Sequence, residues 1–142
     1  MPWGPKQTVL VPVDFSPESL AAVSTALEIA ASPGGVHVIH VLAELSPAEP
    51  ILLWEAYESG KRREAALMEL AKRLTEAGLP ALKCHVFIGD PGQEIAAFAE
   101  RLHADLIVLP SHGRTGIRRL LIGSVAERVI RLAPCPVLVM RH

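Results

Sequence analysis

The chain has 142 residues, of which half are hydrophobic and 20% are charged, with 14 basic against 15 acidic side chains. This length can bury one substantial core and is short for two, so we expect a single domain over residues 1–142. The balanced charge gives no long-range field that would attract polyanions, which argues against a nucleic-acid partner. The apolar runs are only strand-sized and the first residues lack a signal-peptide core, so we expect a cytoplasmic protein with no membrane partner.

Strand-like and helix-like segments alternate in the first half of the chain. Residues 8–13 have no polar face, which is typical of a strand buried on both sides. Ser16, Pro17 and Glu18 then supply a helix cap, a first-turn proline and a first-turn acid, and predict a helix to about Ala31. Residues 36–42 form the second predicted strand. The two prolines in residues 43–50 predict a mobile surface loop.

The second half continues the alternation. Leucines 67, 70 and 74 recur at helical spacing and predict a long amphipathic helix that ends near Ala77. Further predicted elements are a strand at 82–88, a helix that begins after Asp90, a strand at 106–109, a helix at 124–132 and a strand at 137–140. Apolar strands that alternate with helices predict an α/β fold, with a five-stranded parallel sheet, doubly wound and Rossmann-like, and helices on both faces.

In such sheets, ligands bind beyond the carboxyl ends of the strands, where the strand order reverses. Pro12 lacks a backbone N–H and marks the point where pairing of the first strand stops. Asp14 follows it, and its carboxylate can accept hydrogen bonds from a ligand amino or hydroxyl group. A structural role, as a helix cap or in an Asx turn with Ser16, is the alternative that the residues leave open.

A second candidate follows the fourth strand. Residues 110–116, which include Arg114, and the pair Gly123 and Ser124 make two glycine turns. Glycines let backbone amides approach a phosphate, and a helix that begins at Ser124 offers unpaired N–H groups. Glycine turns also serve ordinary strand-to-helix connections, so both interpretations stand on the residues alone.

Other chemistry has weaker support. His37 and His40 are three apart on a strand and point to opposite faces, so they cannot share a metal, and no other Cys or His cluster has ligand spacing. Ser111 and His112 lack the setting of a nucleophile elbow, and no Walker lysine is present. We therefore expect no catalytic residue and no metal site, and interpret both cysteines as structural.

Several motifs, in order along the chain, resemble the universal stress protein family. They are residues 11–16 (VPVDFS), 40–41 (HV), 89–91 (GDP), 104–108 (ADLIV), 111–114 (SHGR), 123–127 (GSVAE) and 133–139 (APCPVLV). ATP-binding members carry the pattern Gly-x2-Gly-x9-Gly-Ser/Thr. Gly113, Gly123 and Ser124 fit this pattern, whereas Pro110 stands at the first glycine. The chain thus resembles the ATP-binding subgroup with a modified glycine motif, and its fold the adenine nucleotide alpha hydrolase-like class.

The resemblance implies a site for ATP, or for ADP or AMP, with or without Mg²⁺. The implied phosphate-binding residues are Gly113, Arg114, Gly123, Ser124 and Val125. The implied adenine- and ribose-binding residues are Pro12, Val13, Asp14, Val41, Leu109 and Pro110. Because proline lacks an N–H, one amide contact of the family cannot form here.

The resemblance also implies a nucleotide-dependent stress-response protein that is not an enzyme beyond slow, incidental ATP hydrolysis. It further implies a homodimer through the last strand, Val137–Met140, and a protein partner that the sequence does not name. The alternative is a nucleotide-free dimeric interaction module of the same fold, in which Pro110 marks a disused pocket.

Overall fold

The structure is a computed structural model that describes residues 3–44, 52–112 and 122–141. Its elements in chain order are β1 (Val9–Pro12), α1 (Pro17–Ile29), the 3-10 turn η1 (Pro33–Gly35), β2 (Val36–Leu42), α2 (Leu52–Glu76), β3 (Lys83–Ile88), α3 (Pro91–Leu102), β4 (Leu106–Pro110), α4 (Ser124–Leu132) and β5 (Val137–Met140). The strands pair in parallel in the order β3-β2-β1-β4-β5. The predicted α/β class is confirmed.

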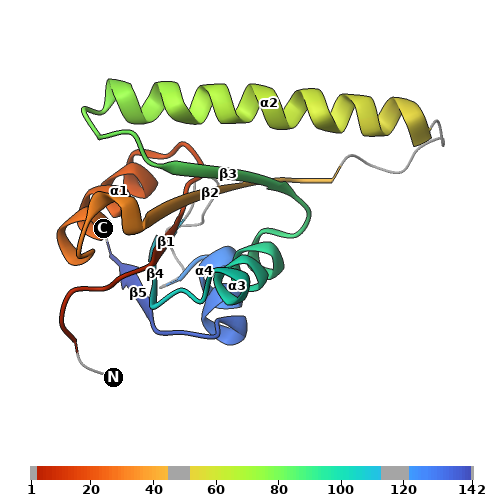
Figure 1. The fold of residues 1–142 in the computed structure, drawn as a ribbon. Coiled ribbons are helices and arrows are strands. Elements are labelled where there is room, and N and C mark those ends of the chain that lie inside the picture. The colour runs from red at the N-terminus through yellow and green to blue at the C-terminus, as the bar shows by residue number, and fades with distance from the viewer. Residues whose placement is uncertain (1–2, 45–51, 113–121, 142) are drawn as a thin grey trace.

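Helices cover both faces of the sheet (Figure 1). Val9 and Val11 of β1 belong to the core under α1 and α2, whereas Leu10 belongs to the core under α3 and α4. All three side chains are 0% exposed, which explains why β1 has no polar face. The central strand is therefore fixed by packing on both sides.

The helix starts that the sequence predicts are present. Ser16 caps α1 by accepting a hydrogen bond from the Ser19 N–H at 3.1 Å, and Asp90 caps α3 by accepting one from the Gln93 N–H at 3.0 Å. Proline occupies the first turn of each helix. The caps fix where each helix leaves the carboxyl edge of the sheet.

Some element ends differ from the predicted ones. Helix α1 ends at Ile29 and not near Ala31, because the Lys6 N–H donates to the Ile29 carbonyl and the Ala31 N–H donates to the Lys6 carbonyl. Strand β1 begins at Val9, and the preceding Thr8 N–H donates to the Asp105 carboxylate instead. In the predicted loop at 43–50, residues 45–50 lie outside the described residues.

Candidate functional site

The strand order places the switch point of the sheet between β1 and β4, because the chain continues from β1 to β2 on one side and later returns to β4 on the other. Strand β1 stops at Pro12, which is level with Ile39 of β2. Strand β2 continues three residues further, to Leu42. The carboxyl edge of the sheet is therefore stepped, and the central strand is the one that stops short.

Asp14 forms the turn by which the chain leaves β1. Its Oδ1 accepts a hydrogen bond from the Ser16 N–H at 3.0 Å, and its own N–H donates to Ser19 Oγ at 3.3 Å. The Asx turn, one of the two roles open for Asp14, is thus present. The half-buried carboxylate still lies at the carboxyl end of β1, where a ligand group could reach it.

Phe15 is a site neighbour that the sequence did not single out. Its φ of 66° is in the left-handed region, which costs a non-glycine residue about 1–2 kcal/mol. The ring packs at 4.5 Å from the His40 ring and 5.7 Å from the Arg73 guanidinium, measured between centres. His40 Nδ1 lies 2.6 Å from the Val13 carbonyl oxygen and donates to it. Tertiary contacts with β2 and α2 thus hold this turn, which local sequence does not reveal.

The far side of the switch point is built from the end of β4. Pro110 is level with Met140 of β5, and the Ser111 N–H donates to the Met140 carbonyl at 2.8 Å. Because alternate residues of a parallel strand bond to the same neighbour, the backbone of Pro110 faces β1 instead. The N–H that proline lacks would therefore have faced the switch point. Leu109 is 2% exposed and packs in the core under α3 and α4.

The start of α4 is fastened to the end of β4 by the Gly123 N–H, which donates to the Ser111 carbonyl. Gly123 is the N-cap and gives no side-chain hydrogen bond to the first turn. Ser124 and Val125 are exposed. The structure therefore places these three predicted residues beside the carboxyl end of β4, whereas Gly113 and Arg114 lie outside the described residues.

Val41 lies in the part of β2 that extends past the end of β1, and it supplies backbone groups there. The Ile39 carbonyl accepts a hydrogen bond from the Val13 N–H at 2.8 Å, so Ile39 faces β1. Leu42 faces β3, since its carbonyl accepts from the Gly89 N–H at 2.9 Å. By the same alternation, the N–H and C=O of Val41 face the β1 side, beyond the point where β1 ends.

A shallow groove of about 790 Å³ lies between α3 and α4. Ser124 and Val125 line one end of it, together with Arg128 of α4 and Gln93 of α3. Arg128 forms an ion pair with Asp90 across the groove at 3.1 Å. The groove thus opens beside the start of α4 and borders the predicted phosphate region.

Two neighbouring strands bring a histidine pair together, which sequence reasoning missed. His37 Nδ1 and His85 Nε2 lie 3.0 Å apart although the residues are 48 positions apart in sequence. Burial lowers the pKa of both imidazoles, with smaller contributions to the His37 pKa from His85 and Lys83 and to the His85 pKa from Lys83. Within the described ranges, no three His, Cys, Asp or Glu residues group as metal ligands.

Asp105 lies near Ser111 and His112 in sequence, but the structure places it at the opposite end of β4, so the three do not form a Ser-His-Asp arrangement. Asp105 precedes β4, and its Oδ2 accepts hydrogen bonds from the N–H groups of Gln7 and Thr8 at 2.9 and 3.0 Å. Ser111 and His112 follow β4 at the opposite end, where Ser111 Oγ lies 3.2 Å from His112 Nδ1. Asp105 is thus a structural residue of the amino edge.

The universal stress protein family model matches residues 6–141. The chain belongs to the universal stress protein family. Universal stress protein MJ0531 of Methanocaldococcus jannaschii is 39% identical over 140 residues, which cover 94% of this chain and 81% of that protein.

Solved structures of universal stress proteins share the fold. The universal stress protein UspA from Lactobacillus plantarum superposes with a TM-score of 0.75 at 27% identity and covers 97% of this chain and 99% of that one. A universal stress protein in complex with cAMP superposes with a TM-score of 0.62 at 28% identity, over 96% of this chain and 98% of that one. None of the helices within the described ranges is both long and apolar enough to cross a membrane.

Proposed function

We propose that this universal stress protein, a single domain over residues 1–142, is a cytoplasmic protein that binds ATP, or ADP or AMP, at the carboxyl edge of its sheet. It acts as a nucleotide-dependent stress-response module, with no enzymatic activity beyond slow, incidental ATP hydrolysis. The observation that carries the proposal is the stepped edge at the switch point, where β1 stops at Pro12 and β2 continues. Its two cysteine thiols are free, as is usual in a reducing compartment.

Val41 supports a site for the adenine base. Its N–H donor and C=O acceptor face the space beyond β1, and adenine presents an amino donor beside a ring-nitrogen acceptor. The Asp14 carboxylate lies at the neighbouring strand end, where it can accept from a ribose hydroxyl. The structural relative whose ligand is cAMP also carries an adenine nucleotide, which supports this class of ligand.

The start of α4 supports a site for the phosphates. A helix N-terminus presents unpaired N–H groups and the positive end of its dipole, and here the cap residue is glycine, which leaves these groups without a side-chain partner. We place the phosphates against Gly123, Ser124 and Val125, with Gly113 and Arg114 as further proposed contacts from the family motif. Mg²⁺ would accompany the phosphates, with no protein ligand assigned.

Ser124→Asp tests the phosphate position separately from the fold. An acidic residue in the first turn favours the α4 dipole, so the free energy of unfolding should stay the same or rise by a few tenths of a kcal/mol. The same charge should repel a triphosphate and weaken ATP binding at least tenfold in isothermal titration. Ser124→Ala is the matched control, with a smaller loss. Equal ATP affinity in wild type and Ser124→Asp would exclude this phosphate position.

The nucleotide-free interaction module is the second candidate, and Pro110 favours it because its missing N–H lies on the switch-point side. Pro110→Gly returns that N–H. If the wild type binds no nucleotide and Pro110→Gly binds ATP, the proline has closed the site and the module is the function. If both bind, the remaining contacts are sufficient for binding.

We also propose a homodimer through β5 (Val137–Met140). Strand β5 pairs only with β4 in the described sheet and forms its edge, and Leu138 is 38% exposed there. An apolar edge strand readily pairs with a second copy. Light scattering should give a dimer mass for the wild type and a monomer mass for Leu138→Lys. A monomeric wild type would refute the proposal.

A further inference from the structure

Arg62 occupies an unusual position on α2. Ala66, Leu70 and Leu74 are buried, the two leucines in the core under α1 and α2, and Arg62 precedes them at the same four-residue spacing. A cation therefore continues a stripe that is otherwise apolar. Helix α2 extends past the carboxyl end of β2 at its N-terminal end (Figure 1). Arg62 lies at this edge of the sheet, because its side chain contacts Ala43, the first residue after β2.

The Arg62 guanidinium is only partly satisfied. Its Nη2 donates a hydrogen bond to the Ala43 carbonyl at 3.1 Å, which anchors the side chain just after the end of β2. Its Nη1 is buried and has no hydrogen-bond partner in the described part of the chain. A buried donor on a charged group is costly to leave unpaired, so this atom indicates a place where an acceptor is missing.

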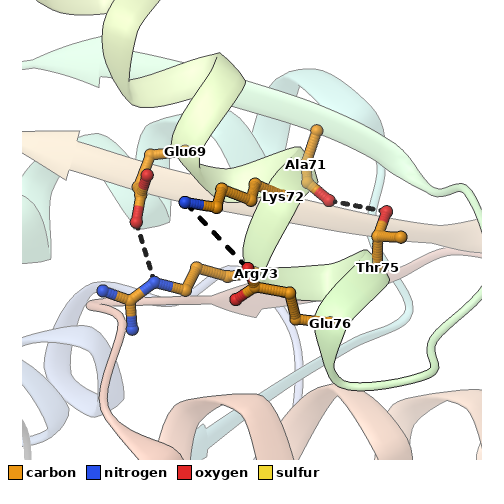
Figure 2. Close-up of polar contacts among 6 residues, drawn as sticks. All are labelled: Glu69, Ala71, Lys72, Arg73, Thr75 and Glu76. Atoms are coloured by element: carbon orange, nitrogen blue, oxygen red, sulfur yellow. Dashed lines mark hydrogen bonds and ion pairs between the residues drawn. The ribbon is translucent and has the colours of Figure 1, made fainter.

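Two other cations of α2, Lys72 and Arg73, are paired. Figure 2 shows Arg73 Nε bonded to Glu69 Oε1 at 2.8 Å, and Lys72 Nζ beside Glu76 Oε1 at 4.0 Å. Both pairs are substantially exposed and follow ordinary i,i+4 helix spacing. The lack of a hydrogen-bond partner at the buried Nη1 of Arg62 is thus not shared by these two cations of the same helix.

The hydrogen bond to Ala43 also shows at which end of β2 the guanidinium lies. Ala43 is the first residue after β2, so Arg62 is held at the carboxyl end of this strand, two residues along from Val41. Strand β2 extends past the end of β1 at this edge, so Arg62 and Val41 lie at the same side of the stepped edge.

We propose that Arg62 is a ligand-binding residue whose Nη1 donates to an acceptor atom at the base end of the bound nucleotide, on the nucleobase or its ribose. This inference rests on the proposed nucleotide site and adds to it a residue from α2. The choice of the base end follows from the sheet: Arg62 is anchored after β2 and Ser124 follows β4, and these two strands flank β1 and lie two strand spacings, about 10 Å, apart.

The test compares Arg62→Met with Arg63→Met, a control at the adjacent exposed cation. Isothermal titration with ATP and with inorganic tripolyphosphate, together with urea unfolding, is carried out on each variant and on wild type. We expect Arg62→Met to weaken ATP binding at least tenfold and to leave tripolyphosphate binding within twofold. Its stability without ligand should equal or exceed that of wild type, because an unpaired buried donor is removed. Arg63→Met should match wild type in all three measurements.

The possible outcomes separate the two proposals. Equal ATP affinity in wild type and Arg62→Met overturns the role of Arg62 and leaves the nucleotide site intact. A parallel loss of tripolyphosphate binding overturns the assignment to the base end. If Arg62→Met is less stable than wild type, Arg62→Lys separates two roles. Restored stability without restored ATP affinity supports the contact with the ligand. Stability and ATP affinity that are restored in proportion show that Arg62 is structural. A wild type that binds no nucleotide refutes the proposed function and this inference together.

Discussion

Replacement of Gly35 by alanine is expected to destabilise the protein strongly, because the backbone of another segment occupies the place of the new methyl group. A Cβ at Gly35 would overlap the Gln7 carbonyl oxygen and lie 3.1 Å from its carbon. The Gln7 segment cannot easily retreat, since the N–H groups of Gln7 and Thr8 are bonded to Asp105. The clash therefore involves two fixed backbones at the amino edge of β1 and β2.

The expected magnitude follows from this rigidity. Overpacking costs about 1–3 kcal/mol, and a clash that no side-chain rotation relieves belongs at the upper end. The lower entropy of the unfolded alanine chain returns about 0.4–1 kcal/mol, which leaves a net loss of about 2–2.6 kcal/mol. For a chain of this length the loss corresponds to a decrease in Tm of about 7–9 °C.

Gly34→Ala is the matched control, because the nearest atom to its added Cβ is Ser32 Oγ at an ordinary 3.8 Å. Urea unfolding monitored by circular dichroism gives the free energy of unfolding of both variants. Gly34→Ala should lie within about 0.5 kcal/mol of wild type or above it. Stabilities of the two variants that agree within about 0.5 kcal/mol would refute the reasoning about this backbone contact.

Two further predictions concern half-buried polar groups. Burial lowers the pKa of His37 and of His85, so the unfolded chain binds protons at these residues more readily than the folded protein does. Their contribution to stability is therefore complete above about pH 6.5 and is lost as the pH falls below that value. Urea unfolding at pH 7.5, 6 and 5 should show a smaller loss of stability in the double variant His37→Gln/His85→Gln than in wild type, and an identical loss would contradict this cause. Asp105→Ala removes the acceptor of two backbone N–H groups and should lower the free energy of unfolding by about 1–3 kcal/mol in the same assay. The stability of Asp105→Asn should lie between that of Asp105→Ala and wild type. A loss below about 0.5 kcal/mol in Asp105→Ala would show that water replaces the carboxylate.

Much of the fold was predictable because its signals are local. The apolar run of β1 and the capping residues Ser16 and Asp90 each act within a few residues, and the strand at 36–42 is confirmed with its predicted bounds. The ends of β1 and α1 were harder to predict, because Asp105 and Lys6 determine them from distant parts of the chain.

The site was predictable in part. The rule that ligands bind at the switch point identified the ends of β1 and β4, and the structure places Asp14 and Ser124 there. The contacts of Phe15 with His40, the His37 and His85 pair and the anchor of Arg62 depend on strand register and on the position of α2 over the sheet. Sequence spacing alone carries no signal for such pairs, so they required the three-dimensional structure.

The central claim is that an adenine nucleotide binds at the stepped carboxyl edge of the sheet. Isothermal titration of the wild-type protein with ATP, ADP and AMP, each with and without Mg²⁺, tests it most directly. We predict saturable binding of at least one of the three, at one site per chain, with affinity that increases with the number of phosphates because they contact the start of α4. No heat of binding from any of the three nucleotides, in protein that releases no nucleotide on denaturation, would contradict the claim.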